Sequence, residues 1–160
     1  MKKILCTIVL SAFVLVFAAA ANANVVWTDW TSAASTVQGT LSIGSSTVGV
    51  TYSGPYAFAQ LDNSGTYYYT NASTYLPNPP PTSGIIGLSD AGTSTITFSQ
   101  AVENPVIALV SWNGAVVNFG TPITFLSYGS SYWGSGFPTL INGDTGFIGN
   151  GELHGVVEVP

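Results

Sequence analysis

Short alternating runs of apolar and polar residues dominate the chain beyond its first two dozen positions. Between Val48 and Tyr52, apolar side chains alternate with Gly49 and Thr51, and the same period of two recurs over residues 95–99. Alternation with this period places one face of a β-strand in a core and the other in solvent. The stretch after Asn24 lacks the 3.6-residue period of an amphipathic helix. The pattern therefore predicts strands along the whole chain.

Continuous apolar runs predict further strands. The run Pro105–Trp112 is typical of a central strand that is buried on both faces. Asn113-Gly114 follows directly and predicts a type I′ hairpin into a strand over residues 115–119, because both residues tolerate the positive φ that this turn needs. We expect two more strands over residues 123–128 and 153–159.

Roughly nine to eleven short strands, with turns every ~8–12 residues, predict an all-β fold, an antiparallel β-sandwich of jelly-roll-like type. The proline-rich stretch Leu76–Gly84 is expected to be a surface loop, because proline lacks the N–H that a central strand requires. The pieces on either side of this loop are too small for separate cores. Residues 24–160 are therefore expected to form a single domain.

Residues 1–23 have the organisation of a secretory signal peptide. Two lysines open the segment, an apolar stretch reaches Phe17, and Ala21-Asn22-Ala23 matches the small-residue cleavage pattern. We expect cleavage before Asn24, export from a bacterial cell, and no membrane attachment afterwards. The alternative is an uncleaved anchor, for which the apolar stretch is short.

Charge excludes several classes of function. The sequence has seven acidic residues, and both of its basic residues, Lys2 and Lys3, lie in the predicted signal peptide together with the single cysteine, Cys6. A mature chain without cations cannot neutralise nucleic-acid phosphates, and one without cysteine cannot form disulfides or use a thiol nucleophile. An anionic polymer would be repelled unless divalent ions bridged it to the protein, so neutral sugars are the favoured direct ligands.

No combination of residues in the sequence indicates catalysis. His154 is the only histidine, and the chain has no G-x-S-x-G motif that would supply an activated serine. On a strand, Leu153 and Val157 would share one face and His154 the other, so we expect a semi-exposed or hydrogen-bonded strand histidine. No pair of carboxylates stands out for glycoside hydrolysis, which remains the less favoured alternative. We therefore expect a protein that is not an enzyme.

Calcium is the cofactor that the sequence could accommodate, because its carboxylates have no cationic side chain to pair with and calcium prefers oxygen ligands. One candidate loop is Asn142-Gly143-Asp144-Thr145-Gly146, with Asn150 and Glu152 close behind it, and a second is Asp62-Asn63-Ser64-Gly65. Neither stretch has the spacing of an EF-hand, and plain turns are the alternative explanation of both. The main candidate ligands are Asn142, Asp144, Asn150 and Glu152.

Aromatic residues near glycine-rich turns form the remaining candidate site. Exposed rings can stack on the apolar faces of sugars, while strand alternation would place Tyr67 and Tyr69 on one face and Tyr68 on the other. The alternative is that these rings pack the edges of a sandwich. The predicted glycan-binding residues are Tyr67, Tyr69, Tyr132 and Trp133.

Three stretches of the sequence carry a resemblance to a known family. WTDWTS, TITFSQAVENPVIALVSWNG and YWGSGF…GNGELHG resemble the secreted β-rich domains of bacterial PEP-CTERM proteins. The resemblance covers most of Trp27–Val157 and implies export by a Gram-negative bacterium that produces exopolysaccharide. It implies no catalytic residues. Members usually continue into a C-terminal sorting segment, whereas this sequence stops at Pro160; we favour a truncated chain over release without sorting.

These observations predict a non-enzymatic secreted protein of the cell surface or extracellular matrix, associated with exopolysaccharide in a biofilm. The alternative is a dedicated glycan-binding module that uses exposed aromatic residues, with calcium as an optional partner. A planar platform of exposed rings would favour the second function over the first.

Overall fold

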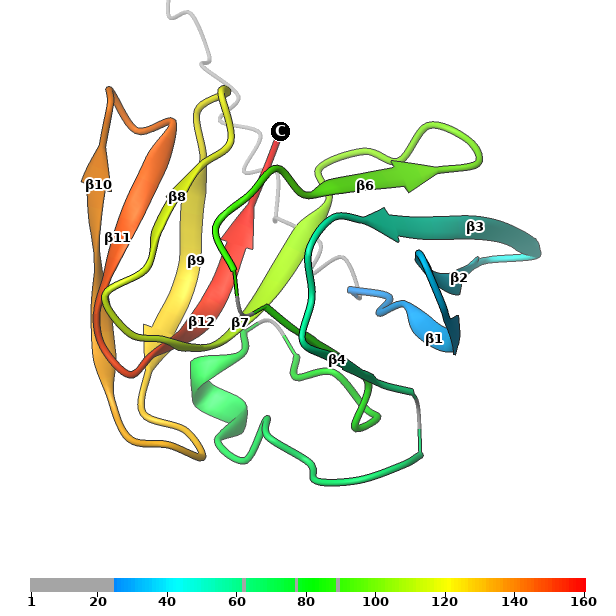
Figure 1. Cartoon of the computed structure of the whole chain (residues 1–160), viewed down its shortest axis with the longest axis horizontal. Coiled ribbons are helices and arrows are strands. Elements are labelled where there is room, and N and C mark those ends of the chain that lie inside the picture. The colour runs from blue at the N-terminus through cyan, green and yellow to red at the C-terminus, as the bar shows by residue number, and fades with distance from the viewer. Residues whose placement is uncertain (1–24, 62, 77, 89) are drawn as a thin grey trace, which may run out of the picture.

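The structure, a computed structural model, describes residues 25–61, 63–76, 78–88 and 90–160, and the predicted signal peptide lies outside them. Within these ranges, the regular secondary structure is β-strand apart from one short 3₁₀ helix, and loops and turns join the strands (Figure 1). Among the described residues there is no helix with the length and apolar character needed to cross a membrane. The elements in chain order are β1 (Asp29–Ala33), β2 (Val37–Ile43), β3 (Ser46–Ser53), β4 (Phe58–Gln60), the 3₁₀ helix η1 (Ala72–Thr74), β5 (Ile85–Gly87), β6 (Thr95–Phe98), β7 (Val106–Trp112), β8 (Val116–Asn118), β9 (Thr124–Gly129), β10 (Gly136–Ile141), β11 (Gly146–Gly151) and β12 (Leu153–Glu158).

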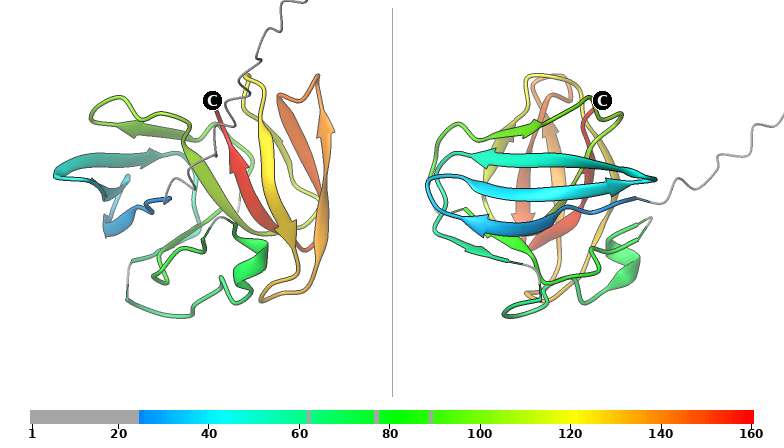
Figure 2. Two further views of the ribbon diagram at one scale, coloured as in Figure 1. Left: turned by 180° about the vertical axis from the view of Figure 1, so that it is seen from behind. Right: turned by 90° about the vertical axis from the view of Figure 1, so that its right-hand side faces the viewer.

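The strands form antiparallel sheets. One sheet has the order β1-β2-β3-β6, two others have the orders β7-β12-β9 and β10-β11-β8, and β4 pairs with β5. Consecutive strands from β7 to β10 alternate between the two three-stranded sheets, an alternation that jelly-roll sandwiches share. Figure 2 shows the four-stranded sheet in front of these sheets, with its strands running across theirs. The prediction of an all-β, antiparallel β-sandwich is confirmed.

β12 lies at the centre of this arrangement, because it pairs with β7 on one side and β9 on the other. Both of its faces are covered, as one cluster of apolar side chains joins the two three-stranded sheets and another joins β12 to the segment before and after η1. The prediction that Leu153 and Val157 share one face of this strand is therefore correct. The buried residues are Leu109, Ile123, Phe147, Leu153 and Val157 in the first cluster, and Tyr69, Tyr75 and Val156 in the second.

The predicted central position of the run Pro105–Trp112 is wrong. The run does form a strand, β7, but β7 pairs only with β12 and is half-buried along most of its length. Its apolar residues are continuous because one side packs in the first cluster and the other packs in the second. A run of this kind indicates two covered faces, which an edge strand can also have.

The predicted Asn113-Gly114 hairpin is also wrong. β7 and β8 lie in different sheets, and Gly114 has a positive φ of 69° whereas Asn113 does not. The chain crosses between the sheets at this point, where the Gly114 N–H donates to the Gly149 carbonyl at 2.8 Å. The crossing is so close that a Cβ on Gly149 would lie 1.9 Å from the Trp112 carbonyl oxygen. Asn113 and Gly114 thus connect two strands of different sheets.

The alternation predicted over Val48–Tyr52 is confirmed in the four-stranded sheet. Val48, Val50 and Tyr52 are buried on β3, and Val48 and Tyr52 oppose Leu41 and Val37 on the neighbouring strand β2. This sheet therefore has an apolar inner face and a polar outer face, as the period of two requires.

Truncation of Phe147 should destabilise the fold strongly. Its fully buried ring contacts those of Trp112, Phe119 and Phe125, with centroids 5.2–6.3 Å apart. We expect Phe147→Ala to lower the free energy of unfolding by about 3–5 kcal/mol, measured by urea denaturation. Phe137→Ala is the matched control, because the Phe137 side chain is 56% exposed. Equal effects of the two substitutions would contradict this assignment of the core.

Candidate functional site

Tyr132 and Trp133 form the tip of a tight turn between β9 and β10. The residues that flank them close the turn, since the Ser131 N–H donates to the Gly134 carbonyl at 2.8 Å and the Gly134 N–H donates back at 3.1 Å. The two aromatic side chains are 46% and 56% exposed. A two-residue turn with large apolar side chains at both central positions is costly in water. It therefore presents these rings as a surface for contact.

Side-chain hydrogen bonds fix this turn to the segment around η1. The Thr74 hydroxyl donates to the Ser130 carbonyl at 2.6 Å, and the Ser131 hydroxyl donates to the Tyr68 carbonyl at 3.0 Å. The Asn71 amide donates to the Ser130 hydroxyl at 3.2 Å. The turn is therefore held by a segment about sixty residues earlier in the chain, so its rings are positioned before any ligand arrives.

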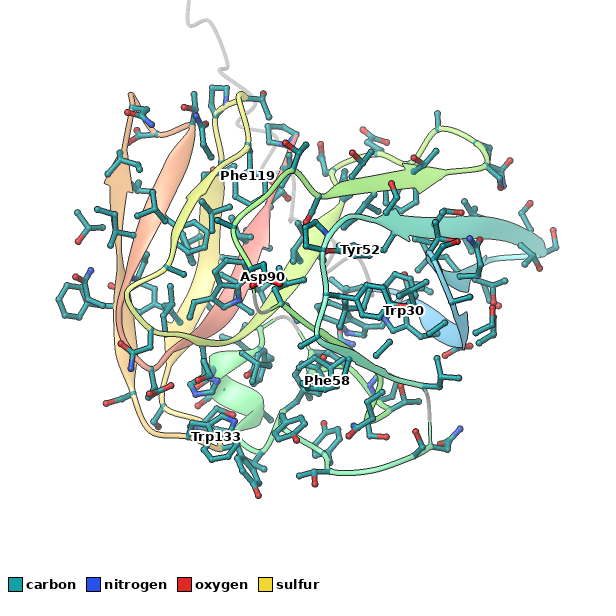
Figure 3. The ribbon with its side chains drawn as sticks, in the orientation of Figure 1. Trp30, Tyr52, Phe58, Asp90, Phe119 and Trp133 are labelled. Carbon is teal, nitrogen blue, oxygen red and sulfur yellow. The ribbon has the colours of Figure 1, made fainter. Side chains whose placement is uncertain are left out.

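Tyr68 joins the two turn residues in one aromatic cluster. Its ring stacks on Trp133 with an interplanar angle of 21° and a centroid separation of 6.2 Å, and it meets Tyr132 edge-on at 5.1 Å. Tyr132 and Trp133 are in edge-on contact at 4.9 Å. We call Tyr68, Tyr132 and Trp133 the aromatic tip; Figure 3 labels Trp133 at one end of the molecule.

The other two predicted glycan-binding residues lie elsewhere. Tyr67 and Tyr69 are in edge-on contact, with ring centroids 5.6 Å apart, but only Tyr67 is exposed, at 38%. Tyr69 is only 5% exposed and donates to the Gly84 carbonyl at 2.9 Å, while Tyr67 donates to the Pro80 carbonyl at 2.8 Å. Tyr69 therefore lacks the exposure that stacking on a ligand requires, and the sequence-based set omitted Tyr68.

A cluster of hydrogen-bonded polar side chains borders the aromatic tip. Glu152 accepts a hydrogen bond from the Ser111 hydroxyl and another from the Asn113 amide at 2.9 Å. A Cβ on Gly134, next to Trp133, would lie 3.6 Å from Cγ of Glu152. We call Ser111, Asn113 and Glu152 the polar cluster. Carboxylate, amide and hydroxyl groups beside exposed rings are the groups that bind the hydroxyls of a stacked sugar.

The hydrogen bonds of the polar cluster favour the ionised form of Glu152. The donors Ser111 and Asn113 lower the pKa of its carboxyl group, and His154 adds a weaker effect in the same direction. A general acid needs the opposite, a carboxyl group whose pKa is raised so that it holds a proton at neutral pH. Glu152 is thus suited to accepting hydrogen bonds.

His154 lies beneath the polar cluster and supports it. Its side chain is fully buried, and its Nδ1 accepts from the Ser111 N–H at 3.4 Å and lies 3.2 Å from the Tyr75 hydroxyl. Ser111 has a left-handed φ of 56° at a β-bulge where β7 faces His154. The bulge turns the Ser111 hydroxyl toward Glu152, so the histidine acts as a structural hydrogen-bond acceptor, in keeping with the prediction of a hydrogen-bonded strand residue.

The four predicted calcium ligands do not converge. Asn142 and Asp144 lie in the turn before β11, both with left-handed φ, whereas Asn150 and Glu152 lie at the far end of that six-residue strand. Since a strand rises about 3.3 Å per residue, one ion cannot contact both pairs. Across the described ranges, no three His, Cys, Asp or Glu side chains gather where they could hold a metal ion. In the second candidate loop, Asp62 lies outside the described residues.

Comparisons with known proteins give no match: no family model matches the chain, and neither the curated proteins nor the solved structures yield a relative.

Acidification below neutral pH should destabilise the folded chain through His154. Burial lowers its pKa below the ordinary value of 6.5, so the unfolded chain takes up a proton first as the pH falls. The stabilising contribution of the neutral ring is therefore complete above pH 6.5 and decreases as the pH falls below it. The groups that face the ring are Tyr75, whose pKa burial raises to about 12, and Glu152, whose lowered pKa places its own effect below pH 4.5.

Urea unfolding between about pH 7.5 and pH 5.5 would measure this effect. As the pH falls, the free energy of unfolding should decrease in the unmodified protein and stay nearly constant in His154→Gln, because the chain has no other histidine. The same slope in both proteins would show that another group titrates in this range.

Proposed function

We propose that this chain is a non-enzymatic extracellular protein that associates with neutral polysaccharide through the aromatic tip, with the polar cluster binding sugar hydroxyls beside it. The observation that carries the proposal is the pair of exposed rings at Tyr132 and Trp133, which hydrogen bonds hold in place against Tyr68. Rings of this kind offer sugars an apolar surface at a low cost in conformational entropy.

The charge of the chain favours neutral sugars as ligands. All seven acidic residues lie beyond residue 24, whereas both basic residues lie before it. An anionic polysaccharide would meet repulsion and no cationic partner on the described surface. Stacking and hydrogen bonding need no charge, so they are the interactions that a neutral sugar would use.

The N-terminal sequence and the family resemblance support an extracellular location. A basic start, an apolar stretch and Ala21-Asn22-Ala23 are the features of a secretory signal. The resemblance to PEP-CTERM proteins points to an exopolysaccharide matrix. A protein placed in such a matrix would need contact with sugar and no catalytic machinery, which agrees with the lowered pKa of Glu152.

Removal of the exposed rings tests this function. We expect Tyr132→Ala/Trp133→Ala to weaken binding to soluble neutral polysaccharides about tenfold or more, measured by affinity electrophoresis through gels that contain each polymer. Phe137→Ala is the matched control, since its ring is as exposed as that of Trp133 and lies outside the aromatic tip. If both proteins migrate like the unmodified one in every gel, the proposed function is wrong.

Chelation should leave this binding unchanged. The aromatic tip and the polar cluster need no metal, and the predicted calcium ligands lie at opposite ends of β11. We therefore expect equal retardation by neutral polymers in the presence of calcium and of EDTA. Retardation that EDTA abolishes would instead show that a cation mediates the contact. For an anionic polymer the expectation is reversed, because only bridging cations could hold it to this surface.

A further inference from the structure

We infer that the chain has a second sugar-binding site, in the cavity beside β1, so that one molecule can bridge two polysaccharide chains. The inference extends the proposed function to a surface that the aromatic tip does not include. The open cavity has a volume of about 460 Å³, and the described residues that line it are Asp29, Trp30, Thr31, Leu61 and Asn63.

Local strand geometry presents Trp30 at this cavity. The pairing of β1 with β2 is irregular between Trp30 and Ser32, and a bulge of this kind changes the direction in which a side chain points. On β2, a Cβ on Gly39 would lie 2.9 Å from Cε3 of Trp30, so only glycine leaves room for the indole at this position. The Trp30 side chain is partly buried and packs against the apolar cluster of the four-stranded sheet.

Polar groups at the cavity are free to bind a ligand. The Asp29 carboxylate, the Asn63 amide and the Trp30 indole N–H have no hydrogen-bond partner among the described residues, in contrast to Glu152 and Asn150 on the other side of the molecule. Asn63 has a left-handed φ of 58° in a turn that Ser64 closes by donating to the Leu61 carbonyl. The cavity lining thus combines one acceptor, one amide and one indole.

This set of groups favours a neutral sugar over an ion. Among the described residues, the lining offers one carboxylate, too few for a calcium site, and no Lys or Arg that could hold an anion. Trp30 and Leu61 offer apolar surface for the C–H face of a sugar ring. Asp29 and Asn63 offer an acceptor and an amide for its hydroxyls.

The two sites lie on different parts of the molecule. Trp30 belongs to the β1-β2-β3-β6 sheet, whereas Trp133 belongs to the turn between β9 and β10, and Figure 3 shows the two labels well apart. One polymer chain can occupy each site, and a bivalent protein gains avidity on a repeating polymer and joins separate polymer molecules.

Indole N–H signals distinguish the two sites directly. The sequence has four tryptophans, so ¹⁵N-labelled full chain gives a small set of indole signals that Trp→Phe variants assign. We expect titration with short neutral cello-, manno- and malto-oligosaccharides to shift the Trp30 and Trp133 signals in separate saturable curves. If Trp30 does not shift with any sugar, the second site is wrong even if Trp133 shifts. If Trp30 shifts and Trp133 does not, the second site stands and the proposed tip site fails.

Asp29→Ala/Asn63→Gly is the diagnostic variant. Neither side chain has a hydrogen-bond partner among the described residues, and glycine suits the left-handed φ at position 63, so the fold should be retained. We expect the variant to weaken the Trp30 titration about fivefold or more and to leave the Trp133 titration unchanged. Glu103→Ala is the matched control, because it also removes one exposed carboxylate. Equal Trp30 titrations in the variant and the control would overturn the second site.

Light scattering measures bridging separately. The unmodified chain mixed with galactomannan should raise the apparent mass of the polymer well beyond that of the decorated single chain. The cavity variant and the tip variant Tyr132→Ala/Trp133→Ala should each still bind the polymer but fail to raise its mass further. If either single-site variant cross-links like the unmodified chain, bridging by the two sites is wrong.

Discussion

The burial of β12 on both faces is the constraint on which the rest of the structure depends. Leu153 and Val157 face the cluster that joins the two three-stranded sheets, and Val156 faces Tyr69 and Tyr75. His154 lies on the second of these faces and holds the Ser111 N–H at the bulge of β7. One strand therefore supports the core, the segment that fixes the aromatic tip, and the polar cluster beside it.

Local patterns in the sequence predicted local structure correctly. The period of two in Val48–Tyr52 identified the buried face of β3, because alternation depends only on the geometry of a strand. The same rule separated Tyr68 from Tyr67 and Tyr69. It could not tell how exposed each ring would be, because contacts with distant parts of the chain decide this: Tyr68 meets Tyr132 and Trp133, whereas Tyr69 is buried and donates to the Gly84 carbonyl.

Predictions that needed tertiary contacts failed for physical reasons. Asn113-Gly114 fits a hairpin locally, but here the chain passes from one sheet to the other, next to Gly149. Asp144 and Glu152 are near in sequence, yet the extended strand β11 separates them. The cavity beside β1 left no pattern in the sequence, since Trp30 and Asn63 belong to elements that only the fold brings together.

The crossing at Gly114 also has a consequence for how the chain folds. Neither three-stranded sheet consists of consecutive strands. In one, β8 pairs with β11; in the other, β7 and β9 both pair with β12, which follows them in the sequence. The sheet β7-β12-β9 therefore cannot form before β12 has been synthesised. Such non-local pairing folds slowly, so β7 and β9 would stay without their common partner for part of synthesis.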